Sequence, residues 1–244
     1  MRHASTVIAL ASEDLIAKGR ALAAHSLGVP EDQIVFDEGG FRAADRNEFL
    51  SWFDLARRAE DGDLPAKLKG GLRVRRDSEM HTPVFPNGAC VCEIEVDPET
   101  GGLDLVRYAT VDDVGRCINP LIVHGQTHGG IAQGVGQALW EECAIDSGSG
   151  QPTSGSLMDY GMPRFDNMPS FKTQIVEVLS PTNPFGVKAG GEGGTTPAPA
   201  VIMSAVEDAL SEFGPLDFEM PATALKVWSF IRQARAKRGA SSAA

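Results

Sequence analysis

The stretch ACVCEIEVDPETGGLDLVRYATVDDVG, residues 89–115, decides the fold class of this 244-residue chain. From residue 91 to residue 96, apolar Cys92, Ile94 and Val96 alternate with Val91, Glu93 and Glu95. This two-residue period is typical of a strand that has one face covered. The turn residues PETGG follow, and a second apolar run begins at Leu103. The pattern predicts an antiparallel hairpin in the middle of the chain.

Helical and turn patterns precede this hairpin. Residues 5–30 carry alanine, leucine and isoleucine at helical spacing and stop at a glycine and a proline. Residues 33–43 hold two short β-rich runs around a Gly-Gly pair, which predicts a second hairpin. Asn47 is a suitable N-cap, and we expect it to open a helix over residues 47–60.

After the central hairpin the glycine content rises in HGQTHGGIAQGVGQALWEE, residues 124–142. In a helix, these small residues form a notched face that another backbone or a flat ligand can approach closely. A strand is expected at 173–180, followed by helices at about 197–213 and 221–236. Because strands and helices interleave without a βαβ period, we predict an α+β fold with mixed sheets and packed helices. Its two expected lobes cover about 1–120 and 121–244.

Composition narrows the function classes. Acidic residues outnumber basic ones by 33 to 22, and the net charge of −11 argues against binding to nucleic acid or to an anionic membrane. The chain has neither an apolar run long enough to span a bilayer nor a signal-peptide pattern, so we expect a cytoplasmic location. Cys90 and Cys92 are too closely spaced for a CxxC site, which predicts buried thiols and no iron–sulfur cluster held by this chain.

A lone carboxylate, Glu192, lies among glycines in GVKAGGEGGTTPAP, and three interpretations stay open. A phosphate cradle would need a lysine beside Thr195, but Lys188 precedes the glutamate instead. A helix-cap effect explains the negative charge but not the glycines. A general base explains both, because glycines let a carboxylate come close to a planar ligand. His124 and His128 have metal-ligand spacing, although a solvent-facing or hydrogen-bonded imidazole is the commoner case, and no protein-held metal is expected.

Three separated stretches, at residues 92–142, 155–169 and 183–210, resemble the C-terminal part of the molybdenum-binding subunit of the xanthine dehydrogenase, aldehyde oxidase and carbon monoxide dehydrogenase family. The resemblance implies a molybdopterin cofactor, in its cytosine dinucleotide form. It also implies hydroxylation of an aldehyde or N-heterocycle carbon with oxygen from water, and transfer of electrons to iron–sulfur clusters and FAD on partner chains.

The same resemblance assigns roles to individual residues. Glu192 occupies the place of the catalytic glutamate that accepts a proton beside the metal. Gln126, Lys188, Gly191 and Gln133 occupy cofactor-binding places, and an amide suits this task because it offers donors and an acceptor. Tyr160 lies on a segment that approaches the cofactor pocket in the family, but a structural tyrosine is the alternative.

Family subunits are much longer, and the resemblance covers only their C-terminal part. We therefore expect an absent N-terminal half to complete the site, with this chain as a split subunit or as an inactive structural or assembly fragment. An isolated fragment would expose its docking surface and could self-associate. The residues that select the substrate lie chiefly in the absent part, so the small-molecule substrate stays open.

Overall fold

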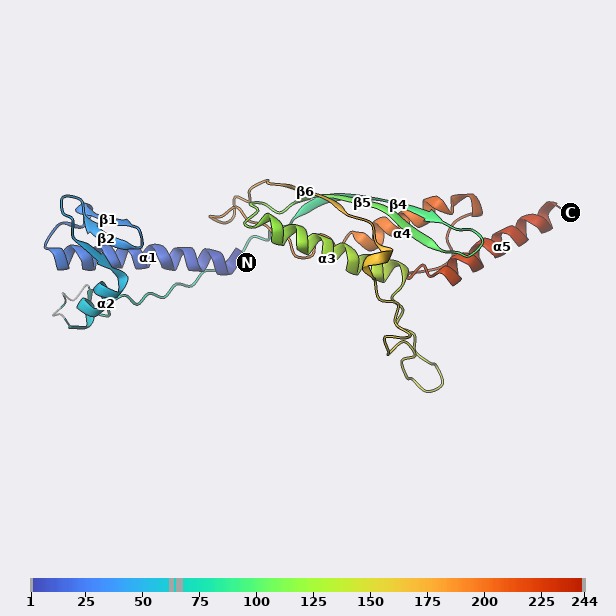
Figure 1. The fold of residues 1–244 in the computed structure, drawn as a ribbon, viewed down its shortest axis with the longest axis horizontal. Coiled ribbons are helices and arrows are strands. Elements are labelled where there is room, and N and C mark those ends of the chain that lie inside the picture. The colour runs from blue at the N-terminus through green and yellow to red at the C-terminus, as the bar shows by residue number, and fades with distance from the viewer. Residues whose placement is uncertain (1, 62–63, 65–67, 243–244) are drawn as a thin grey trace. The chain divides into compact units, whose positions relative to one another are not determined.

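The computed structural model describes residues 2–61, 64 and 68–242, which form two compact units, Met1–Pro83 and Val84–Ala244 (Figure 1). The boundary lies at Pro83, not near residue 120 as expected from the sequence. The reason is that the central hairpin packs on a helix that follows it in the chain, so both belong to the second unit. None of the helices in the described part of the chain is both long and apolar enough to cross a membrane.

The first unit is a long helix packed on a small antiparallel sheet with the strand order β1-β2-β3. Its elements are α1 (Arg2–Leu27), η1 (Glu31–Gln33), β1 (Ile34–Asp37), β2 (Gly40–Ala43), β3 (Phe49–Ser51) and α2 (Trp52–Asp61). The predicted hairpin is confirmed, and Glu38 and Gly39 form its turn with φ values of 48° and 74°. The predicted end of the first helix at residue 28 is also confirmed.

The second helix begins later than predicted. Phe49 and Leu50 belong to β3, and α2 starts at Trp52. The N-terminus is closed by two reciprocal contacts: the Ser51 backbone N–H donates to the Asp54 carboxylate, and the Asp54 N–H donates to the Ser51 hydroxyl. This Ser51–Asp54 pair, and not Asn47, marks the helix start.

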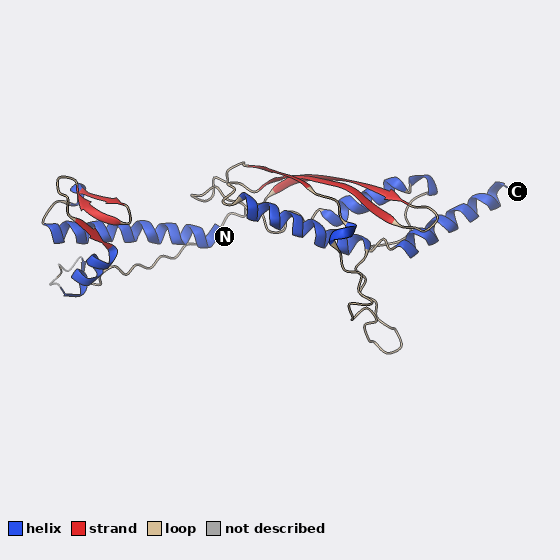
Figure 2. Ribbon diagram, viewed as in Figure 1, coloured by secondary structure: helices blue, strands red, loops and turns tan. Residues whose placement is uncertain are grey.

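The second unit is a mixed sheet with helices on one face (Figure 2). Its elements are β4 (Asn87–Val96), β5 (Leu103–Asp113), α3 (Pro120–Leu139), η3 (Phe165–Asn167), β6 (Lys172–Val176), α4 (Ala198–Ala209), η4 (Ser211–Phe213) and α5 (Ala224–Ser242). β4 and β5 are antiparallel, as predicted, whereas β6 runs parallel to β5. The α+β class with a mixed sheet is therefore confirmed.

One surplus residue in β5 sets which side chains face the helices. Glu93 of β4 pairs with Arg107, but Ile94 pairs with Leu105, so Val106 is an extra residue in a β-bulge. Before the bulge, the odd-numbered Leu105 is buried. After the bulge, the side chains that point toward the helices are those of even-numbered residues, so Tyr108, Thr110 and Asp112 are buried.

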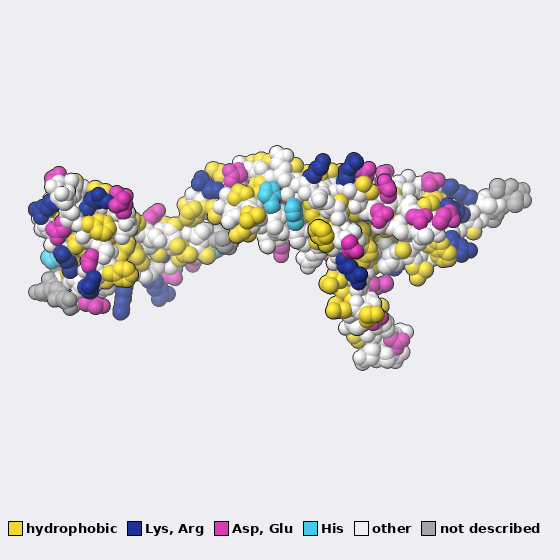
Figure 3. Space-filling model, viewed as in Figure 1, with side chains coloured by type: hydrophobic (Ala, Val, Ile, Leu, Met, Phe, Trp, Pro, Cys, Tyr) yellow, Lys and Arg dark blue, Asp and Glu magenta, His cyan; other side chains and the backbone are white. Residues whose placement is uncertain are grey.

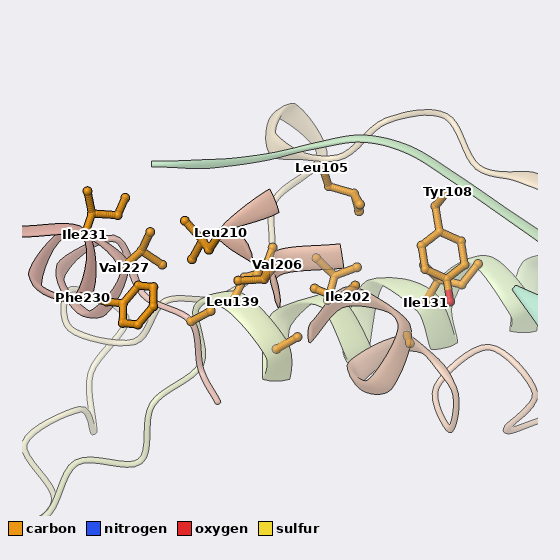
Figure 4. Close-up of a cluster of buried hydrophobic side chains, with 14 residues drawn as sticks. Leu105, Tyr108, Ile131, Leu139, Ile202, Val206, Leu210, Val227, Phe230 and Ile231 are labelled. Carbon is orange, nitrogen blue, oxygen red and sulfur yellow. The ribbon is translucent and has the colours of Figure 1, made fainter. Parts of the chain in front are cut away.

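The core of the second unit lies between this sheet and the two helices α3 and α4 (Figure 4). Ile131 and Val135 of α3 and Ile202 and Val206 of α4 are fully buried, and Tyr108 of β5 packs with them. Cys90 and Cys92 pack against the same cluster from β4, which confirms that their side chains share a face.

The glycines of α3 divide into two groups. A Cβ added at Gly130 would lie 2.8 Å from the backbone nitrogen of Thr195, and one at Gly134 would lie 2.5 Å from the Cβ of Ala198. These positions confirm the predicted close backbone approach. At Gly125 and Gly129, by contrast, an added Cβ would meet no described atom within 4 Å apart from its chain neighbours and the backbone of α3 itself. That part of the helix presents bare backbone.

Gly134→Ala should destabilise the second unit, because the added methyl group collides with α4. Overpacking of this kind costs about 1–3 kcal/mol. The matched control is Gly125→Ala, which meets open space and should stabilise α3 by up to about 1 kcal/mol through helix propensity. Urea denaturation of the 244-residue chain measures both, and equal effects would contradict the packing described for α3 and α4.

Candidate active site

The loop that carries Glu192 is held against α3 by a close backbone contact. A Cβ at Gly194 would lie 2.3 Å from the carbonyl oxygen of Thr127, so only glycine fits there. From the other side, Gly130 leaves room for the Thr195 backbone, and the Thr195 hydroxyl donates to the Gly130 carbonyl at 3.0 Å. The loop position is therefore fixed by glycine on both partners.

Glu192 on this loop lines a pocket of about 690 Å³, together with residues of strands β4 and β5. Its carbonyl oxygen accepts hydrogen bonds from the Thr196 backbone N–H and from the Thr196 hydroxyl, at 3.1 and 3.0 Å. α4 starts after Pro197, and within the described chain no side-chain hydrogen bond caps it. Glu192 therefore makes no capping hydrogen bond to α4 in the described structure, and the helix-cap interpretation has no contact to support it.

Gln126 lies beside the same loop. Its side-chain nitrogen Nε2 is 3.7 Å from the position that a Cβ on Gly191 would occupy. Both residues are exposed, and Gly191 lines the pocket next to Glu192. The structure thus brings three of the predicted site residues together, although they come from α3 and from a loop more than 60 positions later in the chain.

Gln133 contacts the loop at another point. Its Oε1 atom accepts a hydrogen bond from the Thr195 hydroxyl at 3.3 Å. Two helical turns separate Gln133 from Gln126, so Gln133 supports the base of the loop and does not line the Glu192 pocket. A contact between Gln133 and a cofactor stays a prediction.

Lys188 forms an ion pair with Asp113 at the end of β5. The two side chains are only 11% and 12% exposed. The Asp113 carboxylate also accepts hydrogen bonds from the backbone N–H groups of Gly115 and Val178. Burial raises the pKa of Asp113, but the hydrogen bonds from Lys188, Gly115 and Val178 outweigh burial and hold the pKa below its usual 3.8.

Lys188 is therefore not a surface lysine, and its ammonium group has a partner in the protein. The Lys188 backbone N–H also donates to the Val114 carbonyl at 2.8 Å, so side chain and backbone together join the start of the loop to the end of β5. A role of this lysine in cofactor binding stays a prediction. Its partner, Asp113, was missed because nothing in the local sequence pairs residues 75 positions apart.

A second carboxyl group, Asp112, faces the Glu192 pocket from β5. It is 7% exposed, and its Oδ2 atom accepts a hydrogen bond from the Thr110 hydroxyl at 3.2 Å. Burial raises the pKa of Asp112 above its ordinary value, and the hydrogen bond from Thr110 offsets this only in part. Sequence analysis missed this residue because regular alternation from Leu105 would direct it outward.

Comparison with known proteins identifies the chain. The sequence profile of the molybdopterin cofactor-binding domain matches residues 4–169, more than half of the chain. The chain belongs to this family. The matched range includes Gln126 and Gln133 of the molybdopterin cofactor-binding domain and ends before the Glu192 loop.

Similarity to individual proteins extends further along this molybdopterin cofactor-binding chain. The large subunit of nicotine 6-hydroxylase from Paenarthrobacter nicotinovorans is 36% identical over 85% of the chain, and the carbon monoxide dehydrogenase large chain from Hydrogenophaga pseudoflava is 31% identical over 94%. Among solved structures, a Cu,Mo-CO dehydrogenase matches 95% of the chain with a TM-score of 0.79 and 29% identity. Quinoline 2-oxidoreductase from Pseudomonas putida 86 matches 91% with a TM-score of 0.74 and 30% identity.

The chain spans just over a quarter of the length of these relatives: 26% of the nicotine 6-hydroxylase subunit, 28% of the carbon monoxide dehydrogenase chain and of quinoline 2-oxidoreductase, and 29% of the Cu,Mo-CO dehydrogenase chain. The resemblance found in the sequence motifs is therefore confirmed at the level of the family. It applies to one part of a larger subunit.

The histidines and Tyr160 of the molybdopterin cofactor-binding domain lie apart from the Glu192 pocket. His124 and His128 share the Thr173 hydroxyl, at 2.7 and 3.2 Å, and their ring centroids lie 6.4 Å apart. Figure 3 shows histidine side chains, in cyan, on one face of the second unit. Within the described ranges, no group of three or more His, Cys, Asp or Glu side chains is placed to hold a metal ion. Tyr160 lines a different pocket, next to Trp140, and its hydroxyl interacts with Glu141.

Lys188→Met should lower the free energy of unfolding by about 3 kcal/mol, because it leaves the buried Asp113 carboxylate without its cation. Lys172→Met, on an exposed lysine of β6, is the control and should change stability by less than about 0.5 kcal/mol.

The Lys188 effect should also depend on pH, since the pKa of Asp113 is lowered in the folded state. The stabilisation is fully present above the unfolded pKa of 3.8 and is lost as the pH falls through the folded pKa. Urea denaturation between pH 3 and pH 7 should therefore show wild type and Lys188→Met converging in acid. A constant difference across this range would contradict the assigned ion pair.

Proposed function

We propose that this chain forms the part of a molybdenum hydroxylase that carries the proton acceptor, Glu192. The observation that carries the proposal is the contact of Gln126 with Gly191, which lines one pocket together with Glu192, in a chain of the molybdopterin cofactor-binding family. The loop that presents the carboxylate is tied to α3 at one end and to β5 at the other. A group that is fixed in this way needs little rearrangement to accept a proton.

The residues present fit a molybdopterin group. Next to Gln126, a side chain added at Gly125 or Gly129 would meet no described atom outside α3 and its chain neighbours within 4 Å, which leaves room for a flat ligand. The Gln126 amide offers two donors and an acceptor to such a ligand. We assign Gln126 and Gly191 to cofactor binding. We propose the same role for Lys188 and Gln133, both of which also hold the loop in place.

When bound, the molybdenum cofactor supplies a two-electron redox centre and an oxygen derived from water. The role of this chain is to hold Glu192 where it can accept the proton released in that chemistry. Apolar residues, among them Val84, Phe85 and Pro86, line the same pocket as the carboxylate. Such positioned proton acceptors contribute about 10²–10⁴-fold to rate.

The proposed complete enzyme contains more than this chain. We propose that the remaining part of the subunit completes the pocket, that the cofactor is the cytosine dinucleotide form, and that electrons pass to iron–sulfur and flavin partner chains. The proposed substrate is an aldehyde or an N-heterocycle that is hydroxylated at carbon. Support comes from the length of the matched subunits and from the named reactions of relatives that act on nicotine and quinoline.

Glu192→Gln in the assembled enzyme should reduce kcat by at least about 100-fold while molybdenum and pterin stay bound. The amide keeps the size of the side chain but cannot accept the proton at neutral pH. Glu207→Gln, on the exposed side of α4, is the matched control and should leave turnover unchanged. Steady-state kinetics together with metal and pterin analysis make the test. Normal turnover of a cofactor-loaded Glu192→Gln enzyme would remove Glu192 from the mechanism.

The purified 244-residue chain should not retain molybdopterin, because the residues assigned here line one side of the site and are largely exposed. The measurement is molybdenum by mass spectrometry and pterin by fluorescence after oxidation, on chain produced in a host that makes the cofactor. The assembled enzyme from the same host is the positive control. Stoichiometric molybdenum on the isolated chain would contradict this expectation.

A further inference from the structure

Strand β4 forms an open edge of the sheet in the second unit. The strand order is β4-β5-β6, so β4 pairs with β5 on one side and, within the described chain, with no strand on the other. In an antiparallel pair, alternate residues direct their backbone N–H and C=O groups away from the partner strand, so about half of these groups in β4 point to the open side. These donors and acceptors are available to another strand.

This edge lacks most of the features that protect an exposed strand. β4 has ten residues, whereas about five or six are typical, and it contains neither lysine nor proline. The β-bulge beside it adds its extra residue to β5, on the paired side. The opposite edge strand, β6, has only five residues and starts with Lys172. Of the two edges, β4 is therefore better suited to accept another strand.

The hydrophobic core is incomplete along β4. On β5, the inward-facing side chains of Leu105 and Tyr108 are buried. The inward-facing residues of β4 belong to the same core but are only partly buried: Cys90, Cys92, Ile94 and Val96. A strand added beyond β4, with apolar side chains on this face, would extend the layer that covers α4 and remove more apolar surface from water.

The outer face of β4 carries negative charge that the described chain does not balance. Glu93 is paired with Arg107 of β5 at 3.1 Å, but Glu95 lies opposite Asp104, which is another acid. Both Glu95 and Asp104 are exposed, and neither has an ion pair within the described residues. Like charges at directly opposite positions are destabilising, so a cation on the open side of β4 would offset this repulsion.

These charges argue against a second copy of this chain as the occupant of the edge. Each copy has a net charge of −11, and a second β4 would bring two more glutamates and no lysine or arginine. The matched relatives, in contrast, have much more chain to offer, since this chain spans only 26% of the nicotine 6-hydroxylase subunit and 28% of the carbon monoxide dehydrogenase chain. The first residues of β4, from Asn87 to Cys90, also line the pocket that Glu192 lines, which places the edge next to the site.

We propose that the open edge of β4 binds an extended segment from the remaining part of the subunit, which pairs with β4 as an additional strand. The segment carries apolar side chains toward α4 and a lysine or arginine beside Glu95. Because β4 starts at the Glu192 pocket, the added strand also brings the remaining part of the subunit next to that pocket. This inference rests on the proposed function and states how its partner is held.

Hydrogen–deuterium exchange of the isolated 244-residue chain and of the assembled enzyme tests the pairing. In the enzyme, exchange of about half of the β4 amides should slow by at least about tenfold, because these amides gain a hydrogen-bond partner. Residues 109–113 of β5 are the internal control, since they pair with both β4 and β6 in either state. Equal exchange of β4 in the two states would overturn the proposal. Slower exchange of β4 in the isolated chain at higher protein concentration would identify a second copy as the occupant and would also overturn it.

Glu95→Lys tests the charge of the bound segment. In the assembled enzyme it should speed exchange of the protected β4 amides about fivefold, because an attractive pair across the two strands becomes a repulsive one. In the isolated chain it should not lower the urea midpoint, because the new lysine faces Asp104. Glu207→Lys, on the exposed side of α4, is the charge-matched control and should leave β4 exchange unchanged. A lower midpoint in the isolated chain, or β4 exchange equal to that of the control, would contradict the predicted cation.

The two proposals can fail separately. If Glu192→Gln is active in an enzyme whose β4 amides are protected, the proposed function fails and the docking on β4 stands. If Glu192→Gln is inactive while β4 exchanges equally in both states, only the docking on β4 is overturned.

Discussion

The backbone of the loop that carries Glu192 lies directly against the backbone of α3, and the placement of the site depends on this contact. Gly194 meets the Thr127 carbonyl, and Gly130 makes room for Thr195. Any side chain at these positions would force the two segments apart by the width of a methyl group or more. The contact joins helix and loop so closely that Gln126 and Glu192, far apart in sequence, belong to one rigid surface.

Glycine is costly in a helix, by about 1 kcal/mol relative to alanine at each interior position. In α3 this cost is offset where Gly130 and Gly134 pack against the loop and α4. At Gly125 and Gly129 the described chain offers no such compensation. The helix therefore has one part in which glycine serves internal packing and another in which the glycine backbone is exposed.

The two aspartates at the end of β5 show how surroundings decide the chemistry of identical side chains. Asp113 accepts hydrogen bonds from a lysine and two backbone N–H groups, which favour its charged form. Asp112 has burial and a single hydroxyl donor, which favour its neutral form. Two neighbouring aspartates on one strand thus have pKa values that are shifted in opposite directions: the pKa of the ion-paired Asp113 is lowered, and that of the buried Asp112 is raised.

Much of this arrangement could be predicted from local sequence patterns. The alternation in residues 89–115 gave the central hairpin, and glycine spacing gave the notched helix, because both signals lie within a few residues of each other. Three features could not be found in this way. The Lys188–Asp113 pair joins distant segments, the start of α2 depends on a Ser–Asp contact instead of on Asn47, and the unit boundary depends on which helix covers the hairpin. The family motifs located Glu192 without locating the pocket around it.

The bulge at Val106 has a consequence for how such chains are compared. Because one surplus residue reverses the inward phase of β5, the acid that faces the pocket is determined by strand length as well as by residue type. The same sequence paired without the bulge would turn Asp113 inward and Asp112 outward, whereas loss of the Val106 codon would remove the bulge and keep Asp112 inward. Two homologous proteins could therefore share the Asp-Asp pair and still differ in which carboxyl group faces the helices, so the pairing of the residues before it carries as much information as the pair itself.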